Sequence, residues 1–81
     1  MKLPNGLHLF IADVVDVKTG TQEIWRVVDE TYDSALACFI EWANEMLDRY
    51  DYYFFEADED VVEDFIEWHD GEDIDAGIYD K

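Results

Sequence analysis

Apolar and polar residues alternate near the start of the chain in a way that predicts a β-hairpin. The segment 7–17 (LHLFIADVVDV) carries large or β-branched apolar residues on both of its alternating faces, which is typical of a strand buried on both sides. Lys18, Thr19 and Gly20 supply turn chemistry, and the segment 21–28 (TQEIWRVV) is expected to return as the second strand. We therefore expect two antiparallel strands joined by a short turn.

The pattern changes to a helical period after the hairpin. Between positions 36 and 47, apolar residues recur at spacings of three and four, which predicts an amphipathic helix over residues 33–48. Either Thr31 or Asp33 is expected to cap this helix, because a short side chain with an oxygen atom accepts a hydrogen bond from a free N–H of the first turn.

A third strand and a second helix follow. The segment 50–55 (YDYYFF) is rich in aromatic residues, which favours a strand packed near the hairpin. From Asp58 the period is helical again, and Gly71 is the expected end of this second helix. The remaining segment, 72–81, is expected to dock loosely on the domain or to fray.

The order ββαβα predicts an α+β fold, a small antiparallel sheet made of the N-terminal hairpin and the third strand, with two helices covering one of its faces. A chain of 81 residues buries only about 60% of the surface that its unfolded form exposes, so we expect one domain, 1–81, with one small core. The letters FIEW occur at 39–42 and again at 65–68, which suggests that the two helices present similar faces.

Composition favours a folded protein of a reducing compartment. Apolar residues make up 49% of the chain and aromatic residues 16%, which argues against intrinsic disorder. The single cysteine, Cys38, cannot form an intramolecular disulfide, and neither a secretory signal nor a run of about 20 apolar residues is present. We expect a soluble, cytoplasmic protein.

The charge of the chain excludes several classes of partner. It has 22 acidic and 5 basic residues and a net charge of −17, so phosphates of DNA or RNA and anionic membranes would repel it. Residues 1–50 hold 9 acids and 4 bases, whereas residues 51–81 hold 13 acids and a single base. We therefore expect a basic partner protein that binds the C-terminal part of the chain.

The acids of the second helix are spaced like charges on a nucleic acid. None of them has a basic residue three or four positions away, so neighbouring carboxylates repel each other and destabilise the helix. Six carboxylates lie between positions 59 and 70, a length of roughly 18 Å in a helix, or about one charge per 3 Å. One strand of duplex DNA carries about one charge per 3.4 Å. This similarity indicates that the helix can enter a cleft built for a nucleic-acid backbone.

We therefore expect the partner-binding surface to centre on the second helix and its flanks. The candidate residues are Glu56, Asp58, Glu59, Asp60, Glu63, Asp64, Glu67, Trp68, Asp70, Glu72 and Asp73. Nearby aromatic residues are expected to act as anchors in a pocket of the partner. They are Trp42, Tyr52, Tyr53, Trp68 and Tyr79.

The chain shows little sign of catalytic or metal-binding chemistry. The residues available for nucleophilic or acid–base catalysis, apart from the acids, are Ser34, Cys38, His8 and His69. Their positions fit structural roles, and neither histidine has the spacing of a zinc ligand. The acidic segment 73–77 resembles part of a calcium loop, but an EF-hand starting there would need its final Glu beyond position 81. We expect no enzymatic activity, no cofactor and no metal site.

The chain resembles the small acidic DNA-mimic proteins of bacteriophages and mobile elements, which include anti-CRISPR and anti-restriction inhibitors. The resemblance is one of class: it lies in the length, the excess of acids and the acidic, aromatic segment 50–73 (YDYYFFEADEDVVEDFIEWHDGED). It implies a non-enzymatic inhibitor that occupies the nucleic-acid-binding site of a host nuclease or CRISPR effector complex in the bacterial cytoplasm. No shared motif carries the resemblance, so it assigns no role to an individual residue.

Two alternatives remain open at this point. An acidic immunity protein or antitoxin that neutralises a basic toxin nuclease would need the same acids and aromatics, because opposite charge also speeds its association. An acidic housekeeping domain without an inhibitory role is the third hypothesis.

Overall fold

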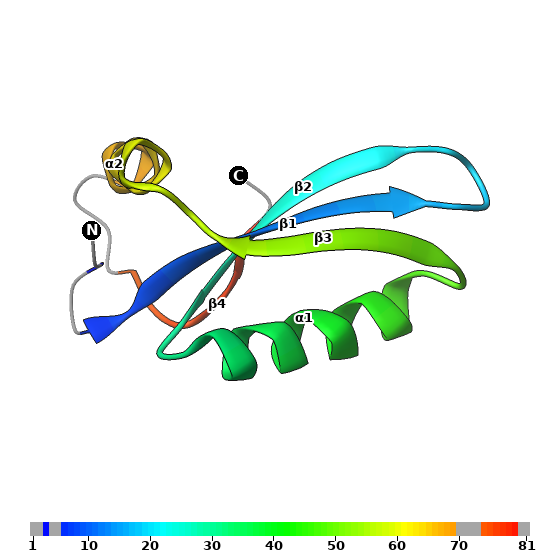
Figure 1. The fold of residues 1–81 in the computed structure, drawn as a ribbon, viewed down its shortest axis with the longest axis horizontal. Helices are drawn as coiled ribbons and strands as arrows, with labels where there is room; N and C mark the ends of the chain where they lie inside the picture. Colours follow the sequence, from blue (N-terminus) through cyan, green and yellow to red (C-terminus); the bar gives the residue numbers. More distant parts are fainter. Residues whose placement is uncertain (1–2, 4–5, 70–73, 80–81) are drawn as a thin grey trace.

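The computed structural model describes residues 3, 6–69 and 74–79 and shows a four-stranded antiparallel sheet with two helices (Figure 1). The elements along the chain are β1 (His8–Asp16), β2 (Gln22–Asp29), α1 (Tyr32–Met46), β3 (Tyr50–Glu56), α2 (Glu59–Trp68) and β4 (Gly77–Tyr79). The strand order in the sheet is β3-β1-β2-β4. The predicted α+β class and the order ββαβα are confirmed. The structure adds a short strand, β4, in the segment 72–81 that we expected to be a loosely docked or frayed tail.

Strand β1 lies in the middle of the sheet, which explains its apolar residues on both faces. It pairs antiparallel with β2 on one side and with β3 on the other, so that Ile11 lies between Arg26 and Phe55. Its neighbours Phe10 and Ala12 are buried as well, although they point to the opposite face. The prediction of a strand buried on much of both faces is confirmed, with Asp13 and Val15 only partly buried where α2 does not reach.

The two helices cover opposite faces of the sheet, so the prediction that both cover one face is wrong. Helix α1 packs through Phe39 against the face that carries Phe10. Helix α2 contributes Val62 and Phe65 to the core on the other face, with Leu9. Because alternate residues of β1 are apolar on both faces, each face needs its own cover, and one helix shields each.

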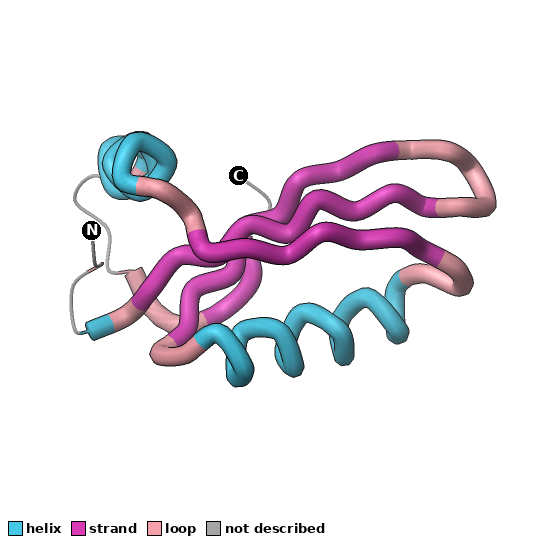
Figure 2. The backbone as a smooth tube through the Cα atoms, viewed as in Figure 1, coloured by secondary structure: helices cyan, strands magenta, loops and turns pink. Residues whose placement is uncertain are grey.

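Helix α2 shields only one end of its face. Figure 2 shows the strands extending past α2 toward the turn between β1 and β2, with no helix above them on that side. On this uncovered part of the sheet, Ile24 of β2 and Tyr53 of β3 are exposed. Both residues pair with Asp13 of β1, so they lie on the same face of the sheet.

Both helices begin with an N-cap residue of the preferred type. The Thr31 side chain accepts a hydrogen bond from the Ser34 N–H at 3.1 Å, which decides between the two caps expected for α1. At the start of α2, the Asp58 side chain accepts one from the Val61 N–H at 3.0 Å. The expected end of α2 at Gly71 lies outside the described residues.

Candidate partner-binding surface

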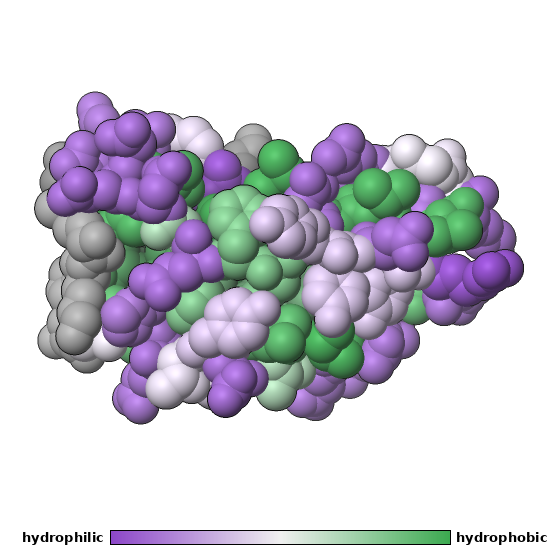
Figure 3. All heavy atoms as spheres, viewed as in Figure 1, coloured by the Kyte–Doolittle hydropathy of each residue, from purple (hydrophilic) through white to green (hydrophobic). Residues whose placement is uncertain are grey.

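Helix α2 carries a continuous row of exposed carboxylates. Its buried residues Val62 and Phe65 point into the core, so the polar positions between them point to solvent. We call these exposed acids the acidic surface of α2; they are Glu59, Asp60, Glu63, Asp64 and Glu67. Figure 3 shows the hydrophilic surface that α2 forms at the upper left of the molecule. Five of the eleven predicted site residues thus lie together on one exposed surface.

The acidic surface has the charge spacing expected from the sequence. From Glu59 to Glu67 the helix rises about 12 Å, so its five carboxylates follow at about one per 3 Å along the axis. Among the described residues the ion pairs lie elsewhere, at His8–Glu56 (3.2 Å) and Lys18–Asp48 (3.9 Å). The five carboxylates are therefore not neutralised by any described basic side chain.

Other predicted site residues have structural roles or lie outside the description. The carboxylate of Asp58 caps α2, and that of Glu56 lies 3.2 Å from Nδ1 of His8. Both residues are exposed at the base of the acidic surface. Asp70, Glu72 and Asp73 lie outside the described residues.

The predicted aromatic anchors divide into exposed and packed residues. The most exposed are Tyr53 (68%) and Trp68 (60%), and Tyr52 is 45% exposed. By contrast, Trp42 lies 4.5 Å from Trp25, measured between ring centroids, and belongs to the core on the α1 side. Tyr79, also predicted as an anchor, packs edge-on against Phe65 under α2.

Trp68 places an aromatic ring at the end of the acidic surface. The guanidinium carbon of Arg26, on β2, lies 5.0 Å from the centroid of the Trp68 ring, which is a cation–π contact. The contact connects the end of α2 to the uncovered part of the sheet.

Sequence reasoning missed the exposed residues Phe55 and Ile24. Phe55 lies on β3 with its ring 5.1 Å from that of Tyr53, and both rings are on the sheet face that α2 leaves uncovered. Ile24, on β2, is 49% exposed on this face. The sequence held no local signal for their exposure, because a strand with apolar residues on both faces usually has both faces covered.

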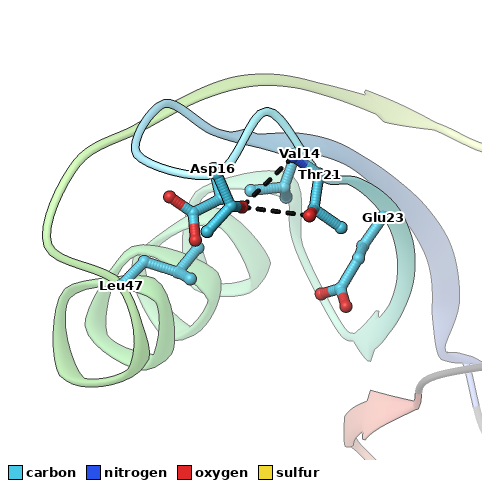
Figure 4. Close-up of a pocket in the computed structure, with 6 residues that line it drawn as sticks. Val14, Asp16, Thr21, Glu23 and Leu47 are labelled. Carbon is cyan, nitrogen blue, oxygen red and sulfur yellow. Dashed lines mark hydrogen bonds between the residues drawn. The ribbon is translucent and has the colours of Figure 1, made fainter.

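A small hollow lies between the turn of the hairpin and the end of α1 (Figure 4). Its volume is about 210 Å³, below the range of about 300–1,000 Å³ that is usual for small-molecule pockets. Thr19 and Thr21 line it and hydrogen-bond to each other, with an Oγ1–Oγ1 distance of 3.0 Å. The carboxylates of Asp16 and Glu23 also line it. The hollow combines hydroxyls and carboxylates without a histidine or cysteine.

The groups considered for nucleophilic catalysis have other partners. The Ser34 hydroxyl donates to the Asp29 carboxylate at 2.9 Å, and Nδ1 of His8 lies against Glu56. Partial burial and the carboxylates of Asp29 and Glu41 raise the pKa of the Cys38 thiol, although the residue is exposed. A raised pKa makes a thiol a weaker nucleophile at neutral pH.

In the part of the chain that the structure describes, no three histidine, cysteine, aspartate or glutamate side chains are arranged to hold a metal ion. None of its helices is long and apolar enough to cross a membrane.

Comparison with known proteins gave no relative: no family model, no curated protein and no solved structure matches this chain.

Proposed function

We propose that this protein is a non-enzymatic DNA-mimic inhibitor of the anti-CRISPR or anti-restriction type. It occupies the basic nucleic-acid-binding cleft of a host defence protein. The observation that carries the proposal is the acidic surface of α2. Five exposed carboxylates lie within about 12 Å of helix, an average of about one per 3 Å of axis, with no described basic partner. This linear charge density is close to that of one DNA strand, which carries about one charge per 3.4 Å of its helix axis.

A protein cleft that binds phosphates presents lysine and arginine side chains, and these also pair with carboxylates. The helix holds its carboxylates in fixed positions, because Val62 and Phe65 anchor it in the core with 1% exposure each. A pre-ordered row of charges loses less conformational freedom on binding than a flexible acidic tail would lose. These features support a mimic of a nucleic-acid backbone.

The test needs a partner, a competitor and a matched pair of variants. The wild-type protein would be used to capture proteins from a bacterial lysate at low salt, and the captured protein would be purified. We expect it to bind labelled duplex DNA or RNA, and we expect the wild-type protein to displace that nucleic acid. Its affinity should fall as salt is added, because the contact is between charges.

The α2 variant reverses three charges of the acidic surface: Glu63→Lys, Asp64→Lys and Glu67→Lys. These positions lie beyond the first turn of α2, where a lysine does not oppose the helix dipole. The control, Glu30→Lys, Glu41→Lys, Glu45→Lys, makes the same change in net charge at exposed positions in or beside α1, on the other side of the sheet. The α2 variant should lose at least tenfold in competition, and the α1 control should compete nearly as well as the wild type.

Equal loss in both variants would show that only net charge matters and would contradict the proposal. A captured partner that does not bind nucleic acid would contradict it too. If the partner is a toxic nuclease encoded beside this protein's gene, the immunity-protein hypothesis replaces the proposal.

A further inference from the structure

Strand β3 forms a long, free edge of the sheet. It lies at one end of the strand order, whereas β4, at the other end, has only three residues. We propose that the free edge of β3 binds an extended, basic segment of the partner protein as an added antiparallel or parallel strand. The inference relies on the proposed function only for the basic character of the partner, and it adds a second contact beside the acidic surface of α2.

The hydrogen bonds that flank the pairing of β1 and β3 identify the backbone groups that are free. The Ala57 N–H donates to the Leu9 carbonyl at 2.9 Å, and the Val17 N–H donates to the Arg49 carbonyl at 3.1 Å. Between these bonds the register is continuous, so the odd-numbered residues of β3 direct their N–H and C=O groups to β1. The even-numbered residues direct theirs away from the sheet; they are Tyr50, Tyr52, Phe54 and Glu56.

The contact of Tyr32 agrees with this assignment. Its hydroxyl, at the start of α1, reaches the Phe54 carbonyl from outside the sheet at an oxygen–oxygen distance of 3.4 Å. No other hydrogen bond from a described residue involves an outward N–H or C=O group of β3. The edge is thus open over most of its length and ready for strand addition.

The edge lacks the features that usually prevent strand addition. Strand β3 (YDYYFFE) contains no proline and no lysine, and its seven pairs with β1 are continuous, without a bulge. Figure 3 shows weakly polar and apolar side chains along this side of the molecule, between the hydrophilic surface of α2 and the hydrophilic turn of the hairpin. An exposed edge of this kind pairs readily with another strand unless charge prevents it.

The exposed side chains of β3 lie on both faces of the sheet. This favours a partner that adds a strand at the edge over a partner that packs on only one face. Tyr52 and Tyr53 are adjacent, so they point to opposite faces, and they are 45% and 68% exposed. A strand beside β3 has side chains on both faces and can cover both rings as cross-strand or diagonal neighbours.

Charge identifies the occupant as basic. Asp51 and Glu56 on β3 make the edge acidic, with Glu56 also in contact with His8, and β3 itself has no basic residue. A second copy of this chain would bring another net charge of −17 to the same edge and would be repelled. Lysine or arginine side chains of an added strand would pair with these carboxylates and lie over the tyrosine rings.

The test measures the exchange of individual backbone amides by NMR. The probe is a synthetic peptide of about ten residues that alternates arginine and valine. Its control has the same number of arginines but carries proline in adjacent pairs (Arg-Pro-Pro-Arg), so it has the same charge and lacks N–H groups on both edges of the extended peptide. At a concentration about ten times its dissociation constant, the valine peptide should slow exchange of the outward amides of β3 about tenfold. The inward amides of Asp51, Tyr53 and Phe55 should change little.

A second measurement uses Tyr52→Pro, which removes an outward N–H and leaves the bonds to β1 in place. This variant should keep the slow exchange of its inward amides and lose the peptide-dependent protection. With the natural partner, it should bind at least several-fold more weakly than the wild type. The α2 triple-lysine variant should retain the protection by the peptide, so failure of the edge and failure of nucleic-acid mimicry are separable.

Three results would overturn the proposal. The proline peptide could protect the outward amides as well as the valine peptide does, the valine peptide could bind without protecting them, or the wild-type amides could become protected at high protein concentration without any peptide. The last result would show that a second copy occupies the edge.

Discussion

At the scale of single residues, neighbouring carboxylates of similar exposure have different roles. Asp58 and Asp64 are both exposed acids near α2, but Asp58 accepts a hydrogen bond from the backbone N–H of Val61, whereas Asp64 has no described partner of this kind. A list of acids from the sequence does not distinguish these roles. Substituting each acid in turn distinguishes the residue that caps the helix from the residue whose carboxylate is available to the proposed partner.

We expect Asp58→Ala to lower the free energy of unfolding by about 1 kcal/mol, because the first turn of α2 loses its cap. Asp64→Ala should leave stability unchanged or raise it slightly, because it removes repulsion from Asp60 and Glu67. Urea unfolding of both variants measures the difference. Equal stability of the two variants would show that the Asp58 hydrogen bond contributes nothing.

Cys38 gives a prediction about pH. Partial burial, followed by the carboxylates of Asp29 and Glu41, raises the pKa of this thiol, so less of it is thiolate at any pH below that pKa than in an unfolded chain. Alkylation by iodoacetamide near pH 8 should therefore be slower in the folded protein than in urea. The ratio of the two rates should approach one as the pH rises above the folded pKa.

The variant Glu41→Gln removes the smallest of the three causes of the raised pKa without touching the cap of α1, and it should speed alkylation of the folded protein. If the wild-type thiol reacts equally fast when folded and unfolded, the thiol is not perturbed.

At the scale of elements, α2 combines a strong anchor with a repulsive outer surface. The buried residues Val62 and Phe65 bind it to the sheet, while its five exposed acids repel one another at spacings of three and four residues. In a helix of ten residues this repulsion is not balanced by any basic residue of the helix itself. Under the proposed function, this loss of stability keeps the carboxylates available to a basic partner.

Neutralising part of this surface should stabilise the protein. Glu63→Gln together with Glu67→Gln removes four repulsive pairs at helical spacing, so we expect the free energy of unfolding to rise by about 1 kcal/mol at low salt. The matched pair Glu41→Gln and Glu45→Gln on α1 removes only one such pair within the helix and should have a smaller effect. Chemical unfolding in about 1 M NaCl should reduce both differences, because salt screens the repulsion. A loss of stability in the α2 variant would show that its acids have stabilising partners.

At the scale of the whole molecule, the net charge of −17 is the dominant electrostatic feature. Among the described residues, the contacts between opposite charges are Lys18–Asp48 and, when His8 is protonated, His8–Glu56, and both involve exposed or partly exposed side chains. Exposed pairs of this kind contribute about 0–1 kcal/mol. The compact state therefore holds its charges together against their repulsion, and the unfolded chain relieves that repulsion by expanding.

This repulsion predicts that salt stabilises the fold. We expect the melting temperature at neutral pH to rise by several degrees between about 20 mM and about 0.5 M NaCl, because the Debye length shrinks below the distance between neighbouring surface charges. The same salt should weaken binding to the partner, so stability and affinity should change in opposite directions. A melting temperature that falls or stays constant would mean that the carboxylates are individually compensated.

The sequence by itself determined every helix and strand except β4, and how charge is distributed among them. The period of apolar residues identified three strands and both helices, because each period reflects the geometry of a single element. The apolar residues on both faces of 7–17 identified a doubly buried strand, now β1. The acids of α2 were identified because an amphipathic helix excludes charged side chains from its buried stripe.

Only the tertiary structure decided which faces meet and which stay open. The letters FIEW occur in both helices, and Phe39 and Phe65 are both buried, yet Trp42 packs against Trp25 while Trp68 is exposed. The difference arises because α1 lies along the sheet, whereas α2 covers only one end of the opposite face. The same long-range packing places β1 in the centre and leaves β3 at an edge. Strand order and helix placement depend on contacts between distant segments, and a local pattern of apolar residues does not contain that information.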